Sequence, residues 1–119
     1  MAEIRKMSGE IFLRVEGNMF KSFYGQMLYI IDGNLLREWQ SRFIIYKVEG
    51  DWIKDFYGRM LYQFDGQTFR TFSGMILYFV KGEYITSFSF ERLYWIRGTL
   101  SKVEMAFLIL LLHEKIIKP

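Results

Sequence analysis

A basic residue recurs at one position along this chain, which makes it the first candidate for chemistry. The series comprises Arg5, Lys21, Arg37, Lys54 and Arg70. Its members are 16 or 17 residues apart, and the series lapses at Thr86. If these cations line up in the fold, they form an arc that could bind phosphate, lipid headgroups or nucleic acid. The alternative is a solvated face, where the basic stems cover aromatic rings and the charged heads pair with carboxylates.

The charge balance limits the anion-binding interpretation. Sixteen Lys and Arg residues against 13 Asp and Glu residues give a net charge of only +3. Carboxylates recur as regularly as the cations, at Glu16, Asp32, Glu49 and Asp65. Nucleic-acid-binding domains usually carry a clearer excess of one sign. The sequence therefore argues against a nucleic-acid partner and leaves peripheral anionic-lipid binding as the anion-binding alternative.

A second recurring series is aromatic and predicts an interaction surface. It comprises Phe23, Trp39, Phe56, Phe72 and Phe88. Leucines recur beside it, at Leu28, Leu61, Leu77 and Leu93. Apolar patches larger than a few hundred Å² on a protein surface usually mark contact sites. These columns therefore predict contact with a protein partner or self-association, which is the function we favour from the sequence.

Residue types that support catalysis or metal binding are scarce in the chain. The one histidine, His113, lies among apolar residues near the C-terminus, where a structural or helix-end role is expected. Cysteine is absent, and no Gly-Lys-Ser/Thr phosphate loop occurs. We therefore expect a non-enzymatic binding module with no catalytic residues, no metal site and no cofactor.

Regularly spaced glycines indicate the elements that position these side chains. The series is Gly17, Gly33, Gly50, Gly66, Gly82 and Gly98. A constant period means one supersecondary unit copied several times. Between the glycines lie runs rich in Ile, Val, Tyr and Phe, which are typical of short antiparallel strands joined by tight turns. Residues 3–98 therefore predict about twelve strands in six hairpin repeats of about 16 residues.

Alternation along the strands assigns residues to the inner face. We expect inward positions for Met27, Tyr29, Ile31; Ile44, Tyr46, Val48; Met60, Tyr62, Phe64; and Ile76, Tyr78, Val80. Their expected neighbours on the second strands are Phe20, Leu36, Ile53, Phe69 and Ile85. The leucine, aromatic and basic series are assigned to the other face.

The C-terminal segment has the pattern of a helix. Ser101 and Glu104 have the spacing of a capping box, and every residue from Met105 to Leu112 is apolar. We predict a helix over about 102–117, with 101–117 as the helical segment of a single 1–119 domain. An apolar run of eight residues is too short to cross a bilayer, which takes roughly 20. A helix that is apolar all round is expected to be buried, and the inside of the sheet is the natural place.

Two arrangements of these elements are open at this stage. The preferred fold is mainly β, closed or barrel-like, with the apolar helix packed in or against the sheet. The alternative is an open flower of hairpins or a small propeller-like array, with the helix on one side or paired with a second subunit. The first residues lack the apolar stretch of a signal peptide, so a cytoplasmic location is expected.

The repeat resembles one known family, and the overall plan resembles another. Units such as residues 25–39 and 58–72, of the form Gly-x-Met-Leu-Tyr-x-Ile/Phe-Asp-Gly-x-x-x-Arg/Lys-x-Phe/Trp, are similar to the hairpin repeats of bacterial 4-fold beta flower proteins. That resemblance covers residues 3–98 and implies no particular chemistry. Twelve strands followed by an apolar helix also resemble the tubby-like barrels, including the scramblase-like and LURP-one-related proteins. This similarity implies a helix threaded through the barrel.

Overall fold

The computed structural model describes residues 1–117 and contains twelve strands and one helix. The strands are β1 (Ala2–Lys6), β2 (Ile11–Glu16), β3 (Met19–Ser22), β4 (Met27–Asp32), β5 (Leu35–Glu38), β6 (Ile44–Glu49), β7 (Trp52–Asp55), β8 (Met60–Phe64), β9 (Thr68–Thr71), β10 (Ile76–Lys81), β11 (Tyr84–Ser87) and β12 (Arg92–Gly98). The helix is α1 (Lys102–His113). The predicted mainly β fold is confirmed.

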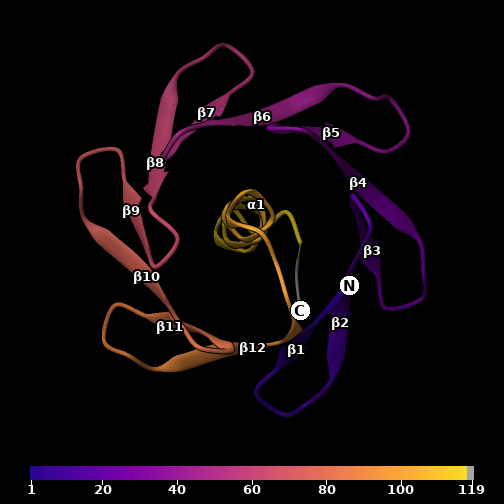
Figure 1. Ribbon diagram of the computed structural model, residues 1–119, viewed down its shortest axis with the longest axis vertical. Coiled ribbons are helices and arrows are strands. Elements are labelled where there is room, and N and C mark those ends of the chain that lie inside the picture. Colours follow the sequence, from indigo (N-terminus) through magenta and orange to yellow (C-terminus); the bar gives the residue numbers. More distant parts are fainter. Residues whose placement is uncertain (118–119) are drawn as a thin grey trace.

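All twelve strands join in one closed antiparallel barrel. Each strand pairs with its neighbours in sequence, and β1 closes the ring by pairing with β12, with Ala2 opposite Gly98 (Figure 1). Because the ring is closed, every strand has a partner on both sides and no edge is left to template aggregation. The open flower and the propeller-like array are therefore excluded for residues 1–117.

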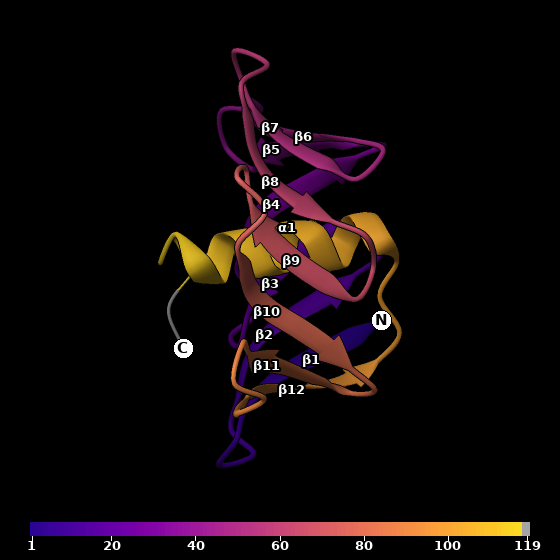
Figure 2. The same ribbon diagram turned by 90° about the vertical axis from the view of Figure 1, so that its left-hand side faces the viewer.

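The helix lies inside the ring along the barrel axis (Figures 1 and 2). Six consecutive helix residues, Ala106 to Leu111, are buried, so α1 has no exposed face over this stretch. A twelve-stranded ring of short strands is too wide for its own side chains to fill, and the helix supplies the missing core. This is the placement that the apolar run predicted.

Three rows of inward side chains surround the helix. The row beside the hairpin turns is Val15, Ile31, Val48, Phe64, Val80 and Ile96, and the middle row is Ile4, Phe20, Leu36, Ile53, Phe69 and Ile85. The third row is Leu13, Tyr29, Tyr46, Tyr62, Tyr78 and Tyr94, and its tyrosines are half-buried. The predicted inner face is thus confirmed for the tyrosine position and for the residue two places after it.

A β-bulge in every repeat corrects the prediction for the remaining inner positions. In β4, Met27 pairs with Lys21 and Tyr29 with Phe20, so Leu28 is the extra residue. Residues directly opposite each other share a face, so Met27 lies on the outer wall beside Lys21. Met27 and Met60 are accordingly 39% and 41% exposed, and the prediction that they point inward is wrong. Leu28 and Leu77, expected on the outer face, pack against the core instead.

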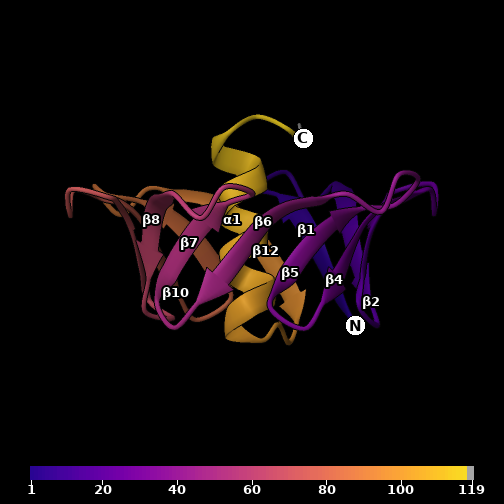
Figure 3. The same cartoon turned by 90° about the horizontal axis from the view of Figure 1, so that it is seen from above.

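The bulge also gives the barrel its flared outline. The same register shift occurs in all six repeats, at Phe12, Leu28, Ile45, Leu61, Leu77 and Leu93. A bulge bends its strand and increases the local twist. Beyond the bulges, the chain turns outward into six loops that splay from one end of the barrel (Figure 3).

The helix begins as predicted and ends earlier. The side chain of Ser101 accepts a hydrogen bond from the Glu104 backbone, and the Glu104 carboxylate accepts one from the Ser101 backbone, so the capping box is confirmed. At the other end, Lys115 adopts a left-handed conformation (φ 57°), and Ile116 N donates to Leu111 O at 3.0 Å. This is a Schellman stop. The helix therefore ends at His113 rather than near residue 117.

Candidate functional site: the aromatic rim

Six loops at the flared end of the barrel carry most of its exposed aromatic side chains. They are residues 7–10, 23–26, 39–43, 56–59, 72–75 and 88–91, and we call them the petal loops and their ring the rim. The petal loops project on the side where the helix C-terminus emerges (Figures 2 and 3). The hairpin turns with the periodic glycines lie at the opposite end.

Each petal loop is a compact, hydrogen-bonded turn. In residues 55–59, Gly58 N donates to Asp55 O at 3.0 Å, and the Asp55 carboxylate accepts from the backbone of Tyr57 and Arg59, both at 2.9 Å. The next-to-last residue of each petal loop has positive φ, and Arg42 and Phe90 adopt this conformation where the other copies have glycine. The loops therefore fix the backbone positions from which their aromatic side chains project.

The structure brings the predicted aromatic series together on the rim. Four of its members are exposed, from Phe23 at 47% to Phe88 at 68%. Trp39 is half-buried, with the Arg42 guanidinium 4.2 Å above its ring. In two loops the next residue adds a second ring, because Tyr24 and Tyr57 stand edge-on to Phe23 and Phe56 at 5.1 and 5.2 Å.

Sequence reasoning missed part of this surface. Tyr57 is 85% exposed, and Phe43, Phe90 and Met75 are also exposed at the rim. Only two repeats have a tyrosine at the position of Tyr57, and only two have an apolar residue at the position that Phe43 and Met75 share, so alignment of the repeats did not mark these positions. The signal that could have found them is an apolar residue next to a turn-forming residue in loops of three to five residues.

The basic series forms a belt around the outer wall next to the petal loops, where Arg5 and Arg37 also donate to the loop carbonyls of Gly9 and Arg42, and four members are paired with carboxylates. Arg5 binds Glu3 (3.0 Å), Lys21 binds Glu16 (3.2 Å), Arg37 binds Asp32 (3.0 Å) and Lys54 binds Glu49 (2.9 Å). The fifth member, Arg70, donates to Gly74 O at 3.5 Å. The Lys54 ammonium lowers the pKa of the Glu49 carboxyl by hydrogen bonding to it. The expected pairing of heads with turn carboxylates is thus confirmed for Lys21, Arg37 and Lys54, whereas Arg5 pairs with Glu3 of its own strand.

Polar groups at the barrel mouth hold the end of the helix. His113 Nδ1 is 2.8 Å from the Tyr78 hydroxyl, and its ring stands edge-on to Tyr62 and Tyr78 at 5.5 Å. The Tyr62 hydroxyl donates to Glu114 Oε1 at 2.5 Å. Burial and this carboxylate raise the pKa of Tyr62, so its phenol stays protonated. The structural role expected for His113 fits these contacts.

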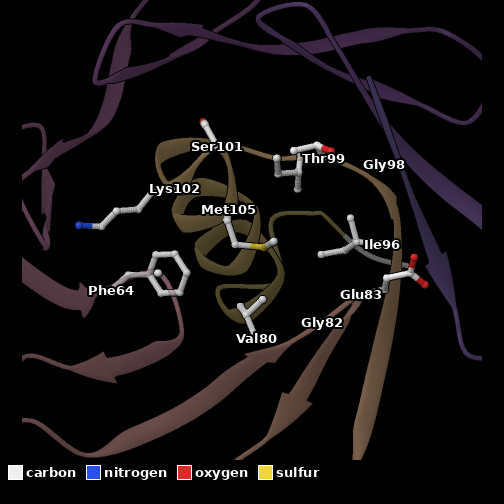
Figure 4. A pocket seen from close by; sticks show the side chains of 12 residues that line it. Phe64, Val80, Gly82, Glu83, Ile96, Gly98, Thr99, Ser101, Lys102 and Met105 are labelled. Carbon is white, nitrogen blue, oxygen red and sulfur yellow. The ribbon is translucent and has the colours of Figure 1, made fainter.

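A hollow of about 340 Å³ lies at the other end of the barrel, beside the first turn of α1 (Figure 4). Its walls are mainly apolar and include Phe64, Val80 and Met105. The two charged residues at its mouth already have partners, since Glu83 accepts from Trp95 Nε1 at 3.1 Å and Lys102 pairs with Asp51. Ligand pockets need polar groups that converge on the ligand, and these do not.

Residues 1–117 contain neither a metal-binding cluster nor a membrane-spanning helix. No group of three or more His, Asp or Glu side chains in this range is arranged to hold a metal ion. No helix in this part of the chain is both long and apolar enough to cross a membrane.

Comparison with known proteins gives no family assignment. The chain matches no family model, no curated protein and no solved structure. The resemblance to beta flower repeats and to tubby-like barrels therefore stays a prediction.

Proposed function

We propose that this protein is a non-enzymatic binding module that contacts a protein partner through the rim. The observation that carries the proposal is a ring of hydrogen-bonded petal loops presenting aromatic side chains on one face. Aromatic residues dominate the energetics of protein interfaces, and Trp and Tyr are enriched among the residues that contribute most to binding. Because the turns fix the loop backbone before binding, little backbone entropy is lost on association.

Site-specific crosslinking tests this function. A photoreactive phenylalanine analogue would replace Tyr57 on the rim in one variant and Gln67, at the opposite end, in a control. We expect position 57 to give a defined protein adduct that excess unlabelled wild-type chain competes away. The Phe56→Ser/Phe72→Ser/Phe88→Ser variant should compete poorly. Equal crosslinking from both positions, or none from position 57, would contradict the proposal.

A second candidate function is peripheral binding of anionic lipid through Arg5, Lys21, Arg37, Lys54 and Arg70. The observation that favours it is an excess of cations on the outer wall, where Arg14 and Lys47 lie directly opposite Lys21 and Lys54. Sedimentation with phosphatidylserine vesicles tests it. Lipid binding through this wall should weaken steeply with salt and with Lys21→Glu/Lys54→Glu. Vesicle association that changes neither with salt nor with these two substitutions would point to the rim instead of the wall.

A further inference from the structure

One petal loop, residues 39–43, departs from the other five. It contains five residues where each of the others contains four. Trp39 stands where four of the others have phenylalanine, and Arg42, like Phe90 in the last loop, holds a positive-φ position (φ 64°) that is strained for residues other than glycine. Strained positions of this kind concentrate at active sites and ligand-binding sites. Residues 39–43 are therefore the part of the rim where a specific contact is expected.

Glu38, the residue before this loop, also departs from its equivalents. In four repeats the side chain at this position closes its petal loop by accepting a hydrogen bond from the backbone N–H four residues further on, at 2.9 to 3.1 Å. These residues are Ser22, Asp55, Thr71 and Ser87. In the third loop the equivalent donor, Phe43 N, bonds to Ser41 Oγ at 3.3 Å instead. No ion pair within residues 1–117 includes Glu38, so its carboxylate neither closes the loop nor pairs with a cation in this part of the chain.

Glu38 lines a hollow of about 310 Å³ between loops 23–26 and 39–43, which we call the Glu38 recess. The other polar or aromatic residues in its lining are Gln26, Tyr29, Trp39 and Gln40. Tyr29 and Glu38 lie directly opposite each other on β4 and β5, which puts both side chains on the same face of the sheet. Burial, with a further contribution from the Glu38 charge, raises the pKa of Tyr29, so its phenol stays protonated. The recess therefore combines the Glu38 carboxylate with a phenol, an indole and two amides.

This set of groups suits a guanidinium. A carboxylate forms short, charge-assisted hydrogen bonds with a guanidinium, and glutamine amide oxygens can accept its remaining N–H groups. An aromatic ring attracts a cation that lies within about 6 Å of its centroid. The chain itself shows this last contact, since the Arg42 guanidinium lies 4.2 Å from the centroid of the Trp39 ring. A lysine ammonium is less well matched, because it has fewer donors and does not stack on a ring as a planar guanidinium does.

An anionic or a purely apolar side chain would fit the recess poorly. The Glu38 carboxylate would repel a phosphate or a second carboxylate, and an apolar side chain would cover Glu38 without offering a hydrogen bond, which carries a desolvation cost. The recess lies on the circumference of the rim, whereas the end of α1 occupies its centre (Figure 1). A partner can therefore reach the recess without displacing the helix.

We infer that the Glu38 recess receives an arginine side chain of the protein partner, with the guanidinium bonded to the Glu38 carboxylate and placed against Trp39. The inference rests on the proposed function and specifies the chemistry of the partner at one point of the rim. The other petal loops supply aromatic contacts, and the recess supplies the charged one. It discriminates between partners, because a partner without arginine at this point leaves the carboxylate covered and unpaired.

NMR titration of the full, isotope-labelled chain with N-acetyl-arginine N-methylamide tests the recess without a partner. We expect saturable shifts at the indole N–H of Trp39 and none at those of Trp52 and Trp95. Glu38→Gln should raise the dissociation constant about threefold, the magnitude expected for an exposed ion pair. Glu83→Gln removes an exposed carboxylate at the opposite end of the barrel and should leave the constant unchanged.

A neutral analogue of the probe isolates the role of charge. Citrulline, capped in the same way, has the shape of arginine without its charge and should bind more weakly by about the same factor. The inference would be overturned by the absence of a saturable shift at Trp39, by equal binding of the two probes, or by equal effects of Glu38→Gln and Glu83→Gln.

The crosslinking assay separates this inference from the proposed function. When Glu38→Gln is added to the chain that carries the photoreactive analogue at position 57, the yield of partner adduct should fall about threefold below saturation, whereas Glu83→Gln should not lower it. Equal yields from the two variants would overturn the inference and leave the proposed function standing. No adduct from any variant, with arginine still bound at Trp39, would contradict the proposed function and leave the recess as an arginine-binding site.

Discussion

Carboxylates at equivalent positions of the repeat have different roles, and one of them controls a turn. Glu16, Asp32 and Glu49 pair with the basic residue five positions later. Asp65 stands at the same place, yet its carboxylate accepts hydrogen bonds from the backbone of Gln67 (2.9 Å) and Thr68 (2.8 Å). The residue types alone predicted turn carboxylates but not which of them form ion pairs and which accept backbone hydrogen bonds, because both arrangements suit an Asp before a glycine.

Asp65 should make the stability of the fold depend on pH. The backbone hydrogen bonds from Gln67 and Thr68 lower the pKa of the Asp65 carboxyl in the folded state. Its contribution is therefore present above the ordinary Asp pKa of about 4 and is lost as the pH falls through the lower folded value. Asp65→Ala should reduce the free energy of unfolding by about 1 kcal/mol at pH 7.

Urea unfolding at several pH values checks this expectation. The difference between wild type and Asp65→Ala should narrow as the pH falls from about 5 to about 3. A difference that stays constant over this range would show that the carboxylate's charge does not matter to the turn.

Elements were largely predictable from sequence, and the exceptions have a common cause. Glycine spacing predicted the hairpins, and the apolar run with its Ser101 cap predicted the helix and its burial. The bulge at Leu28 and its equivalents could not be predicted from the sequence. Every repeat contains it, so no repeat without a bulge is present for comparison. The residues before it, such as Met27, are also as apolar as core residues. The early helix end was missed because Lys115, a non-glycine residue, occupies the left-handed position. Because the rim depends on these bulges, the sequence predicted one column of aromatic side chains rather than six separate loops.

The helix should contribute much of the stability, because it fills the barrel. Leu108 is fully buried at the middle of α1, and Leu108→Ala should cost about 2–5 kcal/mol in the free energy of unfolding. Ile116, just beyond the helix and 43% exposed, is the control, and Ile116→Ala should cost less than about 0.5 kcal/mol. Chemical denaturation followed by circular dichroism measures both.

A chain ending at Ser101 should show no cooperative transition, and a truncated chain that melts like the intact one would refute the role of the helix as core.

At the scale of the whole molecule, closure distinguishes this barrel from other repeat proteins. In an open array each repeat contacts only its neighbours, so stability is approximately a sum over repeats and the loss of one is tolerated. Here the β1–β12 pairing joins the first and last repeats, and all six surround a single helix. We therefore expect the number of repeats to be set by the diameter that α1 requires.

Removal of one complete repeat tests this dependence. Deleting residues 51–66 joins Gly50 to Gln67 and keeps the local hairpin sequence, so each remaining hairpin retains its own turn and pairing. Ten strands enclose a narrower ring that cannot both close and admit α1, and since barrel diameter grows with strand number, we expect the variant to lose cooperative unfolding. Deleting the helix as well, from Lys102 onward, should not restore cooperative unfolding, because the ring then has no core. A shortened chain that unfolds cooperatively with the helix still protected from hydrogen exchange would mean that the wall adapts its circumference and that closure imposes no fixed repeat number.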